Sequence, residues 1–77
     1  KIKFTFAEQK EFETIDDDIA KLEEKIEQLD EEIIENATNS GKLAELTQQK
    51  EKTEEALNEK MDRWVYLNDL AEQIANQ

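Results

Sequence analysis

The side chains in this sequence that could do chemistry are mostly carboxylates. The chain has 77 residues with 21 Asp and Glu, and it contains neither His nor Cys. It therefore lacks an imidazole base, a thiol nucleophile and the usual zinc ligands. Paired carboxylates do acid–base work only where their surroundings push their pKa values apart. The densest run is Asp16, Asp17 and Asp18, which we interpret as part of a solvated helix face.

Motifs for cofactors and metals are missing as well. An EF-hand needs a Gly at the sixth position of a non-helical loop, with ligands at alternating positions, and the acidic run does not fit that spacing. There is no Gly-rich phosphate loop. We therefore expect no catalytic, cofactor-binding or metal-binding residue in this chain, and no enzyme activity of its own.

Positive charge is scarce, and it defines the candidate contacts for nucleic acid. The chain has 10 Lys and Arg and a formal net charge of −11, which is unfavourable for binding phosphate backbones in general. The first ten residues have a net positive charge, because they contain three lysines and a single Glu. The candidate contacts are Lys1, Lys3 and Lys10, with Arg63 close by if the chain folds as described below. A second group of basic residues in the sequence is Lys50, Lys52, Lys60 and Arg63.

The overall composition predicts long helices. The chain has no Pro, one Gly and 40% charged residues, so it can have few turns. The absence of Cys fits a reducing compartment. No apolar run approaches the ~20 residues that span a bilayer, and the first residues lack the apolar stretch of a signal peptide. We therefore expect a soluble, cytoplasmic chain with no membrane contact.

Apolar residues recur with heptad spacing from Phe12 onward. The intervals alternate between 3 and 4 residues over three heptads, a register that disordered acidic segments do not keep by chance. This pattern predicts one amphipathic helix over about residues 6–36, with acidic residues on its solvent face. The apolar positions of this structural seam are Phe12, Ile15, Ile19, Leu22, Ile26, Leu29 and Ile33.

The start of this helix is indicated by a short motif. Thr5 followed by Glu8 matches a capping box, in which each side chain bonds the backbone N–H of the other residue. Thr14 with Asp17 is a weaker alternative that would leave the first apolar residue of the stripe unexplained. Residues 1–4 alternate polar and apolar types, which indicates a short extended lead-in.

Turn-forming residues mark the end of the first helix. The only Gly of the chain lies among them, so we expect a loop over residues 37–41. Gly41 can adopt a positive φ there, and Ser40 or Asn39 can cap the next helix. That helix is expected over about residues 42–75.

The second helix carries a less regular stripe. A strict heptad count places apolar residues at seven of ten positions, while Lys50, Thr53 and Lys60 occupy the other three. The residues of this helix that we assign to the seam are Leu46, Leu57, Trp64 and Leu67.

Two stripes of equal length joined by a short loop predict an antiparallel hairpin. Folding about the loop pairs residues whose numbers sum to roughly 79, which sets Ile15 against Trp64 and Phe12 against Leu67. Trp64 is then expected to fill the seam at the end away from the loop. The fold class is all-α: a two-helix antiparallel coiled-coil hairpin with a short extended lead-in, forming one domain over residues 1–77.

The residues near both ends of the chain resemble a known family. Residues 3–13 read KFTFAEQKEFE and are followed by Ile15 and a helix rich in Glu and Leu. This order is similar to the opening of the C-terminal domain of ABC-F ATPases, with a basic residue, an aromatic after Thr, Glu-Gln, and a further aromatic. Arg63, Trp64 and Leu67 are similar to the Arg-Trp-x-x-Leu close of that family.

The resemblance implies a function that the periodicity alone does not show. Members of this family are soluble tandem ATP-binding-cassette ATPases without membrane domains, which act on or near ribosomes. Their C-terminal hairpin is associated with nucleic-acid binding, so the resemblance implies an accessory domain of a larger protein that contacts DNA, ribosomal RNA or the ribosome. ATP and Mg²⁺ would bind to upstream cassettes, and no nucleotide-binding residue carries over to this chain.

A different class of function stays open beside this one. A two-helix hairpin leaves the flanks of each stripe uncovered, so the chain could instead be a structural coiled coil that self-associates as a homodimer. This alternative assigns no nucleic-acid role to the chain.

Overall fold

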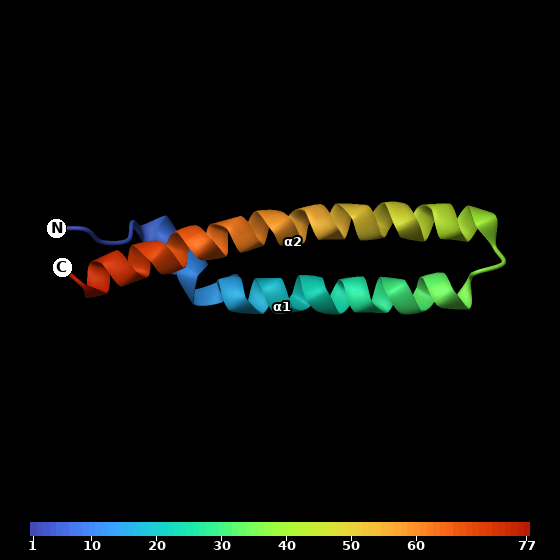
Figure 1. Ribbon diagram of the computed structural model, residues 1–77, viewed down its shortest axis with the longest axis horizontal. Helices are drawn as coiled ribbons and strands as arrows, with labels where there is room; N and C mark the ends of the chain where they lie inside the picture. The colour runs from blue at the N-terminus through green and yellow to red at the C-terminus, as the bar shows by residue number, and fades with distance from the viewer.

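The computed structural model describes residues 1–77 and contains two long helices and no strand (Figure 1). Helix α1 covers Phe6–Glu35 and helix α2 covers Ser40–Ala75. The helices lie side by side and antiparallel, with both termini at one end and the loop at the other. The molecule measures 58 × 17 × 14 Å, the shape of a two-helix rod. The expected all-α antiparallel hairpin is confirmed. Neither helix contains a stretch long and apolar enough to span a bilayer.

Helix α1 begins with the capping box that the sequence predicts. The Thr5 hydroxyl accepts a hydrogen bond from the backbone N–H of Glu8 at 3.1 Å, and the Glu8 carboxylate accepts one from the Thr5 N–H at 2.9 Å. The alternative cap at Thr14 is not used, because the Thr14 hydroxyl bonds back to a carbonyl of its own helix. Two of the free N–H groups at the helix start are thereby satisfied.

The loop is shorter than the sequence suggests. Helix α2 begins at Ser40, and Asn39 caps it by accepting the N–H of Lys42 at 3.1 Å. Gly41 therefore lies in the first turn of the helix, and no residue of the chain has a positive φ. Gly41 does not use the positive φ that is open to it, because the Asn39 N–H bonds the carbonyl of Asn36 and closes the turn without one.

The predicted stripes form the contact between the helices. All seven apolar stripe positions of α1 are buried or half-buried, and Ile15 and Leu29 are almost fully covered. Nine of the ten heptad positions of α2 are covered in the same way, with Leu46 and Leu67 at the centre. The core is therefore a single row of side chains between two helices, as in a coiled coil.

Trp64 is the exception, and here the prediction is wrong. Its side chain does not fill the seam opposite Ile15 but lies at the margin, where 41% of the residue is exposed. The indole N–H donates to a carboxylate oxygen of Asp16 at 2.8 Å. An indole buried in this apolar row would leave that N–H without an acceptor, which accounts for its position at the flank. Leu67, one turn further along α2, is fully buried instead.

Candidate functional site

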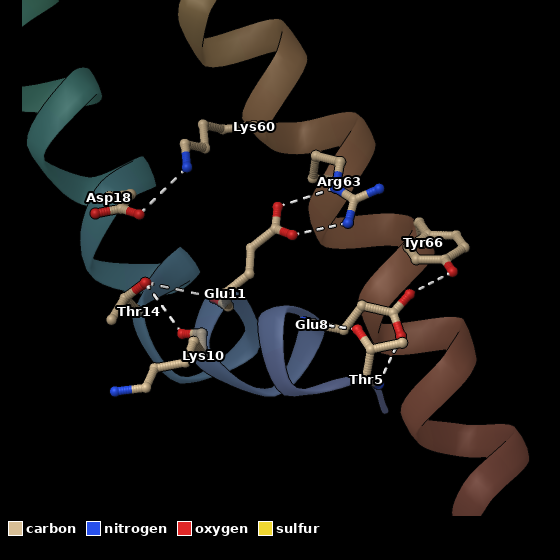
Figure 2. Close-up of polar contacts among 9 residues, drawn as sticks. All are labelled: Thr5, Glu8, Lys10, Glu11, Thr14, Asp18, Lys60, Arg63 and Tyr66. Carbon is tan, nitrogen blue, oxygen red and sulfur yellow. Dashed lines mark hydrogen bonds and ion pairs between the residues drawn. The ribbon is translucent and has the colours of Figure 1, made fainter. Parts of the chain in front are cut away.

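Polar contacts between the helices concentrate toward the end of the hairpin where the termini lie (Figure 2). We call this end the base. The Arg63 guanidinium donates two hydrogen bonds to Glu11, at 2.9 and 2.7 Å, one to each carboxylate oxygen. Such a paired contact suits the planar fork of Arg. The pKa of Glu11 is lowered from its ordinary value, first by this hydrogen bond, and the same contact raises the pKa of Arg63.

Glu8 links the start of α1 to α2. One of its oxygens caps Thr5, and the other accepts the Tyr66 hydroxyl at 2.6 Å (Figure 2). The backbone N–H of Thr5 and then the Tyr66 hydroxyl lower the pKa of Glu8. The carboxylate in turn raises the pKa of Tyr66, mainly through their hydrogen bond. The Arg63 guanidinium lies 4.8 Å from the centre of the Tyr66 ring, so both residues belong to one network.

The lead-in closes the base beside this network. The rings of Phe4 and Phe12 pack with their centres 5.0 Å apart. The backbone N–H of Ile2 donates to the side chain of Gln77 at 2.7 Å, and the Gln77 amide donates back to the Ile2 carbonyl. The two ends of the chain are therefore held together by direct contacts.

The nucleic-acid contact candidates all lie toward this base. Lys1, Lys3 and Lys10 are exposed and form no ion pair, and the Lys10 ammonium lies 5.5 Å from the centre of the Phe6 ring. Arg63 differs from the lysines, because Glu11 neutralises it. Among these four candidates, only the three lysines therefore present positive charge that no carboxylate partner offsets.

Another group of basic residues, which our sequence reasoning did not combine, lines one flank of the seam. A groove of about 610 Å³ beside Leu22 and Ala56 contains three basic side chains, and a second groove of about 240 Å³ beside the same two residues contains two lysines. A heptad projection of both helices could have found this group, since flanking positions of one side share a face. We call it the lysine edge, and its members are Lys21, Lys25, Lys52, Lys60 and Arg63.

The opposite flank is acidic. A groove of about 410 Å³ beside Ile26 and Leu57 is lined by four carboxylates and by no basic residue. Lys50 extends from the seam to this flank, and its ammonium lies 2.6 Å from a carboxylate oxygen of Asp30. The hydrogen bond to Asp30 raises the pKa of Lys50. We call this flank the acidic edge. Its members are Glu23, Glu27, Asp30 and Glu54 of this groove, and Asp16, which lines a neighbouring hollow beside Ile19.

The two edges differ in the chemistry they offer. The grooves of the lysine edge hold five basic residues and only two acidic ones, Asp18 and Glu59. Lys60 is paired with Asp18 at 3.3 Å, and Arg63 is paired with Glu11, which leaves Lys21, Lys25 and Lys52 without an ion-pair partner. No group of three or more acidic side chains converges in an arrangement that could hold a metal ion. The geometry supports recognition of charged surfaces.

Comparison with known proteins identifies the family of the chain. A family profile described as ABC transporter C-terminal domain matches residues 3–69. An uncharacterized ABC transporter ATP-binding protein of Bacillus subtilis (strain 168), YfmR, is 40% identical over 72 residues. This similarity covers 94% of the present chain and 11% of YfmR, so the chain corresponds to a small part of that relative. No solved structure matches the chain significantly.

Proposed function

The chain belongs to the family of ABC transporter C-terminal domains, and from this premise we propose that it is an accessory interaction arm that contacts nucleic acid. It is not itself an ATP-binding cassette. In this proposal the whole protein is a cytoplasmic ATPase, its cassettes bind ATP and Mg²⁺, and the arm meets DNA or ribosomal RNA, alone or on the ribosome.

The shape of the domain supports an arm. Both termini lie at the base, so a chain that enters there also leaves there (Figure 1). The loop end can then project up to 58 Å, the full length of the rod. A stiff projection of this kind can carry a binding surface away from its point of attachment.

The observation that carries the nucleic-acid contact is the separation of charge between the two edges. Lys21, Lys25 and Lys52 have no carboxylate partner and face away from the acidic edge. The unpaired lysines of the base, Lys1, Lys3 and Lys10, add further positive charge near the start of the chain. A phosphate backbone that follows the lysine edge meets positive charge although the whole chain is strongly acidic.

Two triple variants test this assignment. One replaces Lys21, Lys25 and Lys52 with Gln, and the other makes the same change at Lys1, Lys3 and Lys10. Binding of a fluorescent RNA duplex and of a DNA duplex is measured by anisotropy over a range of salt. Each phosphate contact contributes about 0.9 to the salt slope on DNA, so a triple variant that loses three contacts should lower the slope by about 3.

The control changes the net charge by the same amount away from the lysines. Ala44→Glu, Thr47→Glu and Asn58→Asp together add three negative charges at exposed positions of α2. The salt slope should stay near that of the wild type, because no phosphate contact is removed. A slope equally reduced in the control and in both lysine variants would reject the assigned surface in favour of a net-charge effect.

Self-association is the second candidate function. It is favoured by the thin core, since only five residues of the 77 are buried. Sedimentation equilibrium without nucleic acid separates the two candidates. A self-associating coiled coil should sediment as a stable homodimer, whereas a binding arm can be a monomer.

A further inference from the structure

An exposed apolar patch on α1 and α2 has no part in the proposed nucleic-acid contact. Ile19, Met61, Trp64 and Val65 line a hollow of about 390 Å³, and Asp16 is its only polar lining residue. Met61 is 45% exposed and Val65 is 52% exposed, so the hollow is open to solvent. The patch lies on the flank of the acidic edge, across the seam from the lysine edge.

Trp64 makes this patch suitable for a protein partner. Its N–H already bonds Asp16 at 2.8 Å, which holds the indole in place and satisfies its one polar group. Covering the ring therefore leaves no donor unpaired. Tryptophan is enriched among the residues that dominate binding energy at protein interfaces. The ring is thus a preorganised apolar surface.

The charge around the patch decides which partner fits. The acidic edge continues from Asp16 past Glu23 toward the loop, and its grooves contain no basic residue. A second copy of this chain, docked symmetrically through this patch, would bring two acidic edges together, and each copy has a net charge of −11. A nucleic acid would meet the same repulsion. The complementary partner carries positive charge around an apolar anchor.

We propose that Ile19, Met61, Trp64 and Val65 dock a basic amphipathic helix of a partner protein. Its apolar residues cover the patch, and its Lys or Arg side chains lie against the acidic edge. A helix is the expected form, because an apolar stripe with i, i+3 and i+4 spacing fits an elongated surface on a helix pair. This contact uses the flank opposite the lysine edge and does not depend on nucleic-acid binding.

The test uses the 77-residue chain and a synthetic helical peptide of about 15 residues, or four turns, with Leu on one face and Lys beside it. Trp64 is the only Trp of the chain, so its fluorescence reports directly on the patch. We expect saturable binding with a blue shift of the emission. A peptide with Glu for every Lys, and another with Ser for every Leu, should both fail to bind. Equal binding by either would overturn the proposal.

Variants of the patch test its position while keeping every charge. Met61→Ser combined with Val65→Ser should weaken peptide binding by about tenfold or more, since two apolar side chains that the peptide would cover are lost. Ile34→Ser is the matched control, because Ile34 is an exposed apolar residue near the loop and should not affect binding. Circular dichroism checks that each variant keeps its helix content.

Two further results would contradict the proposal. Unchanged peptide affinity in the Met61→Ser, Val65→Ser double variant would show that only the acidic charge attracts the peptide. A wild-type dimer in sedimentation equilibrium that this double variant dissociates would make a second copy the occupant. Neither result bears on the salt slope of nucleic-acid binding, so the two proposals fail independently.

Discussion

Arg63 of α2 binds both carboxylate oxygens of Glu11 of α1, although the two residues are 52 positions apart in the chain. The contact joins the helices near the start of α1, far from the loop that connects them (Figure 2). Both side chains are partly exposed, so water and salt screen the pair and limit its contribution to stability. Its clearer consequence is to orient Arg63 over Tyr66 and to offset one positive charge of the lysine edge.

The first prediction ranks two residues of α2 by their contribution to stability. Leu67 is fully buried, so Leu67→Ala should lower the free energy of unfolding by about 2–5 kcal/mol. Trp64→Ala should cost less, because that side chain lies at the margin of the seam. Urea denaturation followed by circular dichroism measures both. A larger loss for Trp64→Ala would mean that the indole belongs to the core.

This ranking shows what heptad spacing can predict. Spacing alone identified Ile15, Leu29 and Leu67 as core, because small and medium apolar side chains in one row have nowhere else to pack. It misplaced Trp64, since the pattern counts apolar character and ignores the N–H that needs an acceptor. The acceptor, Asp16, comes from the other helix, and only the folded register brings it within reach.

The second prediction concerns the pH dependence of the Glu8 contacts. Its hydrogen bonds with Thr5 and then Tyr66 hold the pKa of Glu8 below the ordinary value of 4.5. A carboxylate with a lowered pKa in the folded state stabilises the fold above its unfolded pKa, and this contribution is lost as the pH falls through the folded pKa. Glu8→Gln should therefore be less stable than the wild type at neutral pH.

Thermal unfolding over a range of pH measures this difference. The gap between the wild type and Glu8→Gln should narrow below pH 4.5. Glu24→Gln serves as the matched control, because Glu24 is exposed on the same helix and makes no hydrogen bond or ion pair. A constant gap at every pH would contradict a role for the Glu8 carboxylate charge.

The third prediction uses Tyr66, the only Tyr of the chain. The hydrogen bond to Glu8 raises the pKa of Tyr66 above 10.0, its ordinary value. Stability from a raised pKa is fully present below the unfolded pKa and is lost as the pH rises through the folded one. Ultraviolet titration of the phenol should show a midpoint above 10.0 in the wild type and a lower midpoint in Glu8→Gln. Identical midpoints would show that the hydrogen bond is absent in solution.

The candidate site was only partly accessible from the sequence. Lys1, Lys3, Lys10 and Arg63 were expected near one another because they lie at one end of a hairpin. The Ile2 contact with Gln77 and the Glu11 contact with Arg63 place the start of the chain beside the end of α2, as expected. The sequence does not show that Glu11 forms an ion pair with Arg63, because a contact between residues 52 positions apart depends on the exact register of the two helices. The exposed patch around Val65 escaped notice for a similar reason, since its hollow is made jointly by both helices.

The last prediction separates two residues at the start of α2. Gly41 lies in the first helical turn without a positive φ, and an added Cβ would meet only the Asn39 side-chain oxygen, at 3.8 Å. Ala restricts the unfolded chain more than Gly, so Gly41→Ala should raise the free energy of unfolding by about 0.4–1 kcal/mol. Asn39→Ala removes the cap and should lower it by about 0.5–2 kcal/mol. Urea denaturation of both variants measures these opposite changes. A loss of stability in Gly41→Ala would instead indicate a positive φ at Gly41 and a start of α2 beyond Ser40, as in the loop over residues 37–41 that the sequence predicts.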